Sequence, residues 1–306
     1  MQKCYIYITE TFGGICTMKF GIYYAYWEKE WGGDCVPYIK KCSQLGFDVL
    51  EVPCGDFHTK PESYFKELKN IAADHGMLLS GGYGPRPEHN LASADTELVE
   101  NAFRFYADVF KKMELAGIDR IGGALYSYWP VDFASGFDKK ADTERSIKNM
   151  RKLADIANDH GVTLCMESLN RFEGYMINEA YEDVDYVKAV DKPNVKSMLD
   201  TFHMNIEEDS IIDAIRLTKG TLGNFHVGEA NRRCPGPDGR MDWKAIGDAL
   251  KEIGYDGYVI MEPFVRMGGK VGQDVSIWRD LSKGATDEQL DLDAAASVKY
   301  LKEIFR

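Results

Sequence analysis

One arrangement of apolar and polar residues recurs along the chain from Met18 onward. A stretch with apolar residues at helical spacing ends in glycine, and a short apolar run follows at once. The arrangement is seen in QLGFDVLEV at 44–52, DHGMLLSGG at 74–82, LAGIDRIGG at 115–123, DHGVTLCME at 159–167 and EIGYDGYVIME at 252–262. Glycine after a helix adopts the left-handed cap conformation at no steric cost, so the pattern predicts helices that pass directly into strands.

This pattern predicts eight strands with helices between them. The expected strands are 20–25, 47–52, 77–82, 119–124, 162–167, 195–200, 223–227 and 258–262. The expected helices lie near 33–45, 61–75, 95–116, 139–160, 178–190, 208–219 and 242–253, and a last helix near 287–305 follows the eighth strand. Strands that alternate with helices favour a parallel sheet with right-handed crossovers.

Eight strand–helix units predict an α/β fold, a single (β/α)8 TIM barrel formed by residues 18–306. The alternative is a doubly wound open sheet. No GxGxxG motif follows the first strand, which disfavours a dinucleotide-binding fold, and we expect no nucleotide cofactor. No linker rich in proline, glycine or serine divides the chain, so one catalytic domain is expected.

Residues 1–17 do not fit the repeating pattern, whereas Met18 opens a strand-like run, KFGIYYAYW. We expect residues 1–17 to be an N-terminal extension, and two interpretations stay open. The segment is either a short additional element or the result of a start codon assigned upstream of the true one. Codons for Gly13 and Gly14 can spell a purine-rich ribosome-binding run ahead of Met18, which favours the second interpretation.

Composition narrows the possible classes of function. The chain is 44% hydrophobic and carries a net charge of −12, which repels phosphate backbones and disfavours nucleic acid as a partner. It has no apolar run long enough to span a membrane and no apolar core of an export signal near its start. Its seven cysteines include no CxxC pair, which indicates reduced thiols and predicts a cytoplasmic location.

Four consecutive strands are expected to end in ionisable side chains. The fifth, sixth and eighth strands end in Glu167, Asp200 and Glu262, and His226 lies near the end of the seventh. Alone, each would be as well explained by a salt bridge, a cap or a satisfied core histidine. Barrel strands bring their carboxyl ends to one rim, however, and clustered buried charges are costly without a counter-ion. The four residues therefore predict a site for one divalent metal ion.

The donor types and the paired glutamates indicate a kind of reaction. Three oxygen donors and one nitrogen favour Mn²⁺, Co²⁺ or Mg²⁺ over a thiolate-preferring metal. Such an ion would polarise the carbonyl of a hydroxy-ketone and stabilise the enediolate left when a neighbouring C–H loses its proton. Glu167 and Glu262 could take a proton from one face and return one to the other, which would invert a carbon centre.

Side chains beyond the strand ends are candidate sugar contacts. The aromatic candidates are Tyr23, Tyr26 and Trp27 after the first strand and Tyr126, Tyr128 and Trp129 after the fourth. Their rings could pack against a sugar, with a hydrophobic lid or a subunit contact as the alternative. Glu173, His203 and Arg232 follow the fifth, sixth and seventh strands and could hydrogen-bond hydroxyl groups, with solvated loop charge as the alternative.

Five longer motifs are familiar: GIYYAYWE at 21–28, IGGALYSYWP at 121–130, ESLNRFE at 167–173, MLDTFHMNIEE at 198–208 and MEPFVRMGG at 261–269. In this order they resemble the D-psicose (allulose) 3-epimerases of the ketose 3-epimerase family, which are similar to D-tagatose 3-epimerases and belong to the xylose isomerase-like barrels. The resemblance extends from Met18 to the C-terminus. One departure is Ser168, where the family is expected to have valine, and another is VGEAN at 227–231 in place of TGECN.

The resemblance implies metal-dependent epimerisation of free ketohexoses at C3, from D-fructose to D-psicose and from D-tagatose to D-sorbose. It implies that Glu167, Asp200, His226 and Glu262 bind Mn²⁺ or Co²⁺, with Mg²⁺ as a further candidate, and that Glu167 and Glu262 exchange the C3 proton. It further implies that Glu173, His203 and Arg232 hold the O1–O3 end of the ketose, that Tyr23 and Trp129 form the pocket wall, and that the protein is a homodimer or homotetramer.

Three alternatives have to be weighed against a C3 epimerase. An aldose–ketose isomerase would move a proton between C1 and C2 with similar ligands. An apurinic-site endonuclease of the same barrel type would need more histidines than the six present, and the acidic charge disfavours DNA. A sugar-binding module without catalysis would have no use for paired glutamates among its metal ligands.

Overall fold

The computed structural model describes residues 18–306 and shows a closed barrel of eight parallel strands in sequential order. The strands are β1 (Lys19–Tyr23), β2 (Val49–Pro53), β3 (Leu78–Gly82), β4 (Arg120–Gly123), β5 (Thr163–Glu167), β6 (Val195–Asp200), β7 (Leu222–Val227) and β8 (Tyr258–Met261). The barrel closes where β1 pairs with β8, with Gly21 opposite Ile260. The predicted (β/α)8 barrel is confirmed, and the open-sheet alternative is wrong. The two interpretations of residues 1–17 concern a segment outside the described residues.

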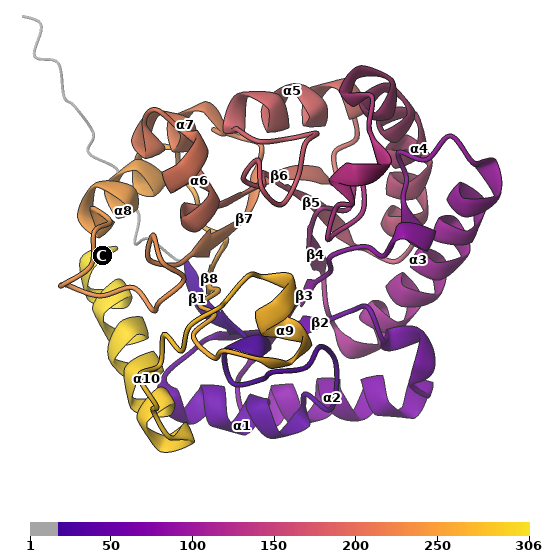
Figure 1. Ribbon diagram of the computed structural model, residues 1–306. Coiled ribbons are helices and arrows are strands. Elements are labelled where there is room, and N and C mark those ends of the chain that lie inside the picture. The colour runs from indigo at the N-terminus through magenta and orange to yellow at the C-terminus, as the bar shows by residue number, and fades with distance from the viewer. Residues whose placement is uncertain (1–17) are drawn as a thin grey trace, which may run out of the picture.

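The helices are α1 (Val36–Leu45), α2 (Glu62–Asp74), α3 (Thr96–Ala116), α4 (Lys139–Asp159), α5 (Ala180–Val190), α6 (Thr201–Glu207), α7 (Ile211–Leu217), α8 (Trp243–Glu252), α9 (Gly269–Asp274) and α10 (Asp287–Ile304). The long helices surround the barrel on its outer side, whereas the short α9 lies over its opening in the view of Figure 1. Short 3-10 helices are η1 (Tyr24–Tyr26), η2 (Phe57–Thr59), η3 (Pro87–His89) and η4 (Phe133–Ser135). Apolar residues between strands and helices form the core. Cys165 is fully buried, as expected.

The predicted strands and long helices agree with the structure to within a few residues at each end. Two short helices, α6 and α9, were not predicted from the sequence. Helix α6 begins directly after β6, and Asp200 is at once the last residue of the strand and the N-cap of the helix. A helix of seven residues is too short to show a clear apolar period, so the sequence pattern does not reveal that His203 lies in a helix.

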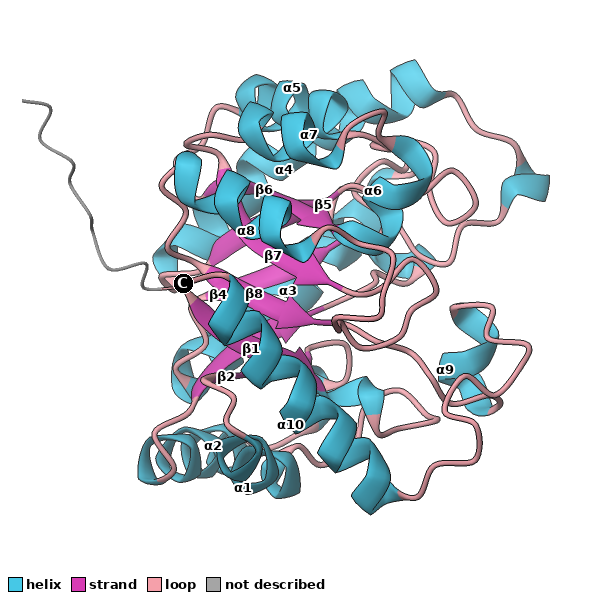
Figure 2. Ribbon diagram, turned by 90° about the vertical axis from the view of Figure 1, so that its left-hand side faces the viewer, coloured by secondary structure: helices cyan, strands magenta, loops and turns pink. Residues whose placement is uncertain are grey.

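Loops at the carboxyl ends of the strands build one open face of the molecule. Figure 2 shows α9 beyond the strand ends on that side of the barrel. The segment that contains α9 contacts the loop after β1, because the backbone N–H of Val271 donates to the carbonyl of Lys29 and the Trp31 indole donates to Asp274. These contacts join the first and last strand–helix loops above the barrel. None of the helices within residues 18–306 combines the length and the apolar character needed to cross a bilayer.

Candidate active site at the carboxyl ends of the strands

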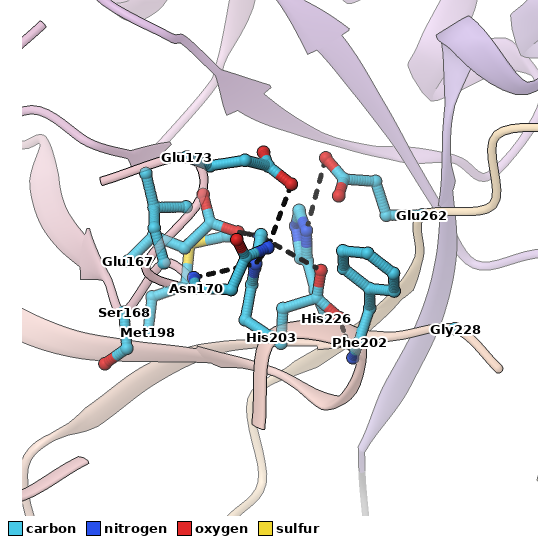
Figure 3. Close-up of polar contacts among 12 residues, drawn as sticks. Glu167, Ser168, Asn170, Glu173, Met198, Phe202, His203, His226, Gly228 and Glu262 are labelled. Carbon is cyan, nitrogen blue, oxygen red and sulfur yellow. Dashed lines mark hydrogen bonds and ion pairs between the residues drawn. The ribbon is translucent and has the colours of Figure 1, made fainter. Parts of the chain in front are cut away.

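The structure brings together the four residues predicted to bind a metal. One ligand atom from each of Glu167, Asp200, His226 and Glu262 lies within 4.8 Å of the others. Glu167 ends β5, Asp200 ends β6, His226 lies in β7, and Glu262 follows β8 directly. Figure 3 shows Glu167 and Glu262 entering from opposite sides of the view, with the His226 ring between them. This group, named the carboxylate–histidine cluster below, could hold one metal ion.

Local hydrogen bonds direct the side chains of this cluster. Asp200 is 1% exposed, and its Oδ1 accepts from the backbone N–H of Phe202 at 2.9 Å, so Oδ2 is the oxygen that faces the cluster. The hydroxyl of Tyr126 donates to the carbonyl oxygen of Glu167 at 2.8 Å and holds the end of β5. The backbone N–H of Glu262 donates to the carbonyl of Val227 at 3.0 Å, which continues the pairing of β7 with β8.

The electrostatics of the cluster fit a divalent cation. Burial, and then the nearby Glu262, raise the pKa of Glu167 well above its usual value, and burial also raises the pKa of Asp200. His226 Nδ1 is buried and has no hydrogen-bond partner within residues 18–306. An unpaired imidazole nitrogen beside three crowded carboxylates is a set of N and O donors that Mn²⁺, Co²⁺ or Mg²⁺ would satisfy. The residues present therefore fit the expected ion.

The other nitrogen of His226 faces a carboxylate that was not singled out from the sequence. Glu51, in β2, is 1% exposed, and its Oε1 lies 2.9 Å from His226 Nε2. Burial lowers the pKa of His226, but Glu51 and Glu262 outweigh this effect and raise it well above the usual value. A carboxylate inside an apolar strand, VLEVP at 49–53, is itself a signal of the kind that identified Glu167.

His203 is oriented by Asn170, from the loop after β5. The backbone N–H of Asn170 donates to His203 Nδ1 at 3.1 Å, and the Asn170 amide lies 2.8 Å from the same nitrogen. Burial lowers the pKa of His203, so the imidazole is neutral at ordinary pH. Because Nδ1 accepts, the hydrogen is on Nε2, which lies 3.7 Å from Glu167 Oε1 and 3.8 Å from Asp200 Oδ2. His203 thus presents a hydrogen-bond donor toward the cluster.

Arg232 connects the cluster with Glu173. Its guanidinium lies 3.0 Å from Glu262 Oε2 and 3.1 Å from Glu173 Oε1, and it stacks on the ring of Phe202 at 3.8 Å. Burial alone would raise the pKa of Glu173, but Arg232 and His203 lower it overall. Arg232 has a positive φ of 63°, a conformation that is rare outside glycine and that concentrates at functional sites. The solvated-loop alternative for Glu173, His203 and Arg232 is therefore wrong.

A cavity of about 480 Å³ opens above the cluster. Strands β3 and β4 line it with glycine, where a side chain would remove space. A Cβ on Gly122 would come within 2.4 Å of Met198 Sδ, and one on Gly82 would lie 3.1 Å from the Tyr23 ring. One side of the barrel therefore delivers charged groups, while the other leaves room for a ligand.

Only some of the predicted aromatic residues line this cavity. Tyr23 and Trp129 do, together with Trp31, Tyr83 and Phe264, which were not predicted. Tyr26 and Trp27 instead pack beneath α10, where their polar atoms donate to Leu290 O and Asp291 Oδ1. Tyr126 and Tyr128 are likewise not among the lining residues. The position of an aromatic residue beyond a strand end does not reveal on which side of the loop its ring will lie. Nothing in the sequence around Trp31 indicated that this loop residue would line the cavity.

Comparison with known proteins agrees with this geometry. Residues 39–291 match the family model of the xylose isomerase-like TIM barrel. The chain is 50% identical to the D-psicose 3-epimerase of Ruminiclostridium cellulolyticum over 94% of its own length and 98% of the relative's. It is 47% identical to the D-psicose 3-epimerase of Agrobacterium fabrum, over 92% and 98% of the two chains.

Solved structures give the same result. The D-psicose 3-epimerase of Clostridium cellulolyticum H10, crystallised with D-tagatose, superposes with a TM-score of 0.93 at 50% identity, covering 94% of this chain and all (100%) of that one. A D-psicose 3-epimerase crystallised in the presence of D-fructose gives a TM-score of 0.92 at 46% identity, with 94% and 99% covered. The chain therefore belongs to the xylose isomerase-like TIM barrel family and, within it, to the D-psicose 3-epimerase group of ketose 3-epimerases, which are enzymes of the isomerase class.

Proposed function

We propose that this enzyme epimerises free ketohexoses at C3, converting D-fructose to D-psicose and D-tagatose to D-sorbose. The observation that carries the proposal is the pair of carboxylates, Glu167 and Glu262, in one buried cluster at the floor of a cavity. A cavity of about 480 Å³ lies within the usual range for small-molecule sites. The two D-psicose 3-epimerase structures, one with D-tagatose and one in the presence of D-fructose, support this choice of substrates.

Glu167, Asp200, His226 and Glu262 would hold one divalent ion, for which Mn²⁺ and Co²⁺ are the first candidates and Mg²⁺ the next. When bound, such an ion polarises a carbonyl oxygen and stabilises the negative charge of an enediolate. The unpaired Nδ1 of His226 and the crowded carboxylates support this assignment.

Within this proposal the two glutamates move the proton. One carboxylate removes the C3 proton from one face of the ketose, which leaves an enediolate. The other carboxylate, across the cluster, delivers a proton to the opposite face, so the configuration at C3 inverts.

Three further side chains would hold the ketose hydroxyls. Arg232 and the Nε2–H of His203 supply donors beside the cluster, and the ionised Glu173 supplies an acceptor. Tyr23 and Trp129 line the same cavity and would cover the C–H face of the sugar. Trp129 also donates to Glu173 at 3.3 Å, so the wall and the acceptor are held in one arrangement.

Product analysis tests the proposal against its main alternative. Purified enzyme loaded with Mn²⁺ or Co²⁺ is incubated with D-fructose, D-tagatose and D-psicose, and the products are separated by chromatography. D-psicose from D-fructose supports C3 epimerisation. Glucose or mannose from D-fructose would mean proton transfer between C1 and C2, which is the reaction of an aldose–ketose isomerase.

A homodimeric or homotetrameric assembly and a cytoplasmic location also remain proposals. The aromatic residues of 126–129 give this assembly little support, because Tyr126 is 2% exposed and Tyr128 and Trp129 are only partly exposed. Better support comes from Phe137 and Phe172, which are exposed beyond the strand ends. The cytoplasmic location is supported by the free cysteines Cys35, Cys42, Cys54, Cys165 and Cys234.

A further inference from the structure

Glu51 is a buried carboxylate inside the barrel that the proposed reaction does not use. It lies in β2, on the opposite side of the closed sheet from the strands that carry the cluster. Within residues 18–306 it contacts the cluster at His226, whose Nε2 lies 2.9 Å from Glu51 Oε1. A fully buried carboxylate is costly unless hydrogen-bond donors surround it, so its retention here calls for a physical account.

Two donors hold the second oxygen of Glu51. Ser80 Oγ, from β3, donates to Glu51 Oε2 at 2.9 Å, and Asn224 Nδ2, from β7, donates to the same atom at 3.3 Å. The orientation of the Asn224 amide is set independently, because its Oδ1 accepts from the backbone N–H of Phe225 at 3.2 Å. Glu51 is therefore fixed in place, with Oε1 directed at His226.

This contact decides which nitrogen of His226 carries a hydrogen. At 2.9 Å from a carboxylate oxygen, Nε2 must donate, because two acceptors at that distance would repel each other. Nδ1 points the other way, 3.6 Å from Glu262 Oε1, and it has no hydrogen-bond partner within the described residues. Nδ1 is thus the nitrogen free to give its lone pair to an ion in the cluster.

We propose that Glu51 is the positioning residue of the metal site: it holds the Nε2 hydrogen of His226, so that Nδ1 is presented as the ligand. The inference rests on the proposed function, since it assumes an ion in the cluster. Carboxylates that receive the second N–H of a metal-binding histidine set its tautomer and ring orientation, and their loss typically weakens metal affinity 10- to 100-fold.

Glu51→Gln is the sharpest variant, because it keeps the shape of the side chain. An amide has one acceptor oxygen, whereas Ser80, Asn224 and His226 all direct donors at this position. The new NH₂ group therefore faces either the NH₂ group of Asn224 or Nε2 of His226, and both are hydrogen-bond donors in the unaltered protein. In the second case Nε2 must lose its hydrogen, Nδ1 gains one, and the ligand nitrogen is blocked.

The first readout is Co²⁺ affinity, measured by calorimetric titration of metal-free full-length protein without any sugar. Glu51→Gln should raise the Kd 10- to 100-fold. Ser80→Ala removes one hydrogen bond to Glu51 but leaves its contact with His226, so it should raise the Kd for Co²⁺ less. The control is Asp142→Asn, another buried carboxylate, which is held by Tyr175 and lies outside the cavity lining. The Kd of Asp142→Asn for Co²⁺ should equal that of the unaltered protein.

The second readout is the imidazole N–H signal of His226 in protein labelled with ¹⁵N-histidine. In the unaltered metal-free protein an Nε2–H protected from exchange with water is expected, and it is assigned by its absence in His226→Asn. In Glu51→Gln the protection should be lost. A role for Glu51 in barrel stability alone would change the melting temperature but would leave Kd and the protected signal as they are.

The outcomes separate this inference from the proposed function. Equal Co²⁺ affinity in Glu51→Gln and the unaltered protein would overturn the inference alone. If Glu51→Gln fails to fold, an unaltered metal-free protein in which Nδ1 carries a protected hydrogen and Nε2 carries none would overturn it instead. The unaltered protein could bind Co²⁺ without converting any ketose, while Glu51→Gln binds Co²⁺ more weakly. That result would support the inference and contradict the proposed function. A protein that binds no divalent ion would overturn both.

Discussion

Arg232 and Glu262 are joined by an ion pair of 3.0 Å, and this pair links a candidate substrate-binding residue directly to a candidate base. The guanidinium reaches Glu173 with its other terminal nitrogen at 3.1 Å, so one planar group connects two carboxylates from different loops. The bridge is buried, since Arg232 is only 3% exposed. A change at Arg232 should therefore affect both the binding of a sugar and the position of Glu262.

Arg232→Lys should lower kcat/KM by about 10- to 100-fold. A lysine ammonium is a single point of charge and cannot join two carboxylates in a fixed plane, so charged hydrogen bonds each contributing roughly 1.5–3 kcal/mol are lost. Steady-state kinetics with D-fructose measures the effect. The matched control is Arg171→Lys, which should leave kinetics unchanged because Arg171 is largely exposed, pairs with Glu207 and lies outside the cavity lining. Equal kcat/KM in both variants would contradict the role of the bridge.

Chelation should abolish activity, and Mn²⁺ or Co²⁺ should restore it. The carboxylate–histidine cluster is the structural basis, because the single guanidinium of Arg232 does not balance the charge of three crowded carboxylates. Removal of the ion should also lower the melting temperature, since a ligand bound only by the folded state stabilises that state by mass action. Full epimerase activity in a preparation verified as metal-free would show that the cluster has another role.

Glu167→Gln and Glu262→Gln should each lower the rate of epimerisation by about 10²- to 10⁴-fold, because an amide cannot accept the C3 proton. Each change also weakens the cluster, so metal content has to be measured in both variants. Glu208→Gln is a matched control, because Glu208 lies outside the cavity lining and accepts from Ala180 N.

Deuterium exchange at C3 in heavy water distinguishes the two glutamates. If one serves each face, metal-loaded Glu167→Gln should still exchange one C3 epimer without interconverting the two. Glu262→Gln should do the same with the other epimer. Exchange of the same epimer by both variants, or normal epimerisation by either, would rule out the two-base mechanism.

The stabilisation by Mn²⁺ should increase as pH rises from the usual carboxyl pKa range toward the raised folded-state pKa values of Glu167 and Asp200. Burial and Glu262 raise the folded-state pKa of Glu167, and burial raises that of Asp200. Both pKa values exceed those of the unfolded chain, so protonation of the two carboxylates stabilises the metal-free fold. This contribution is fully present below the unfolded-state pKa values and is lost as pH rises through the folded-state pKa values. A bound ion replaces the protons. The difference in melting temperature between protein with and without Mn²⁺ should grow as pH rises. A difference that stays constant or shrinks would contradict this prediction.

Light scattering should give a mass of two or four times the 34.6 kDa of one chain. Exposed apolar rings such as Phe137 and Phe172 suit a subunit contact, and closed symmetric assemblies are the usual case for such enzymes. A monomer at micromolar concentration would contradict the proposed assembly. Phe137→Asp should shift the mass toward the monomer if the ring lies in the contact, whereas Ala134→Asp, at another exposed position of the same segment, controls for the single added negative charge.

The sequence by itself determined the barrel and the strand ends that carry its chemistry. Glycine caps followed by apolar runs are local signals. Five of them, together with three further apolar runs between helical stretches, leave few topologies for the chain. Glu167, Asp200 and Glu262 were identifiable because each interrupts an apolar strand at its last residue or just beyond it. Since parallel strands bring their carboxyl ends to one rim, their convergence followed from the fold class without coordinates.

Only the tertiary structure decided how these groups are held. Glu51 meets His226 across the closed barrel, 175 positions away along the chain, and nothing local to either residue encodes that contact. Trp31 lines the cavity while Tyr26 packs beneath α10, although both follow β1. The direction of a loop side chain depends on which distant element it packs against, and the sequence pattern records periodicity within an element rather than contacts between elements.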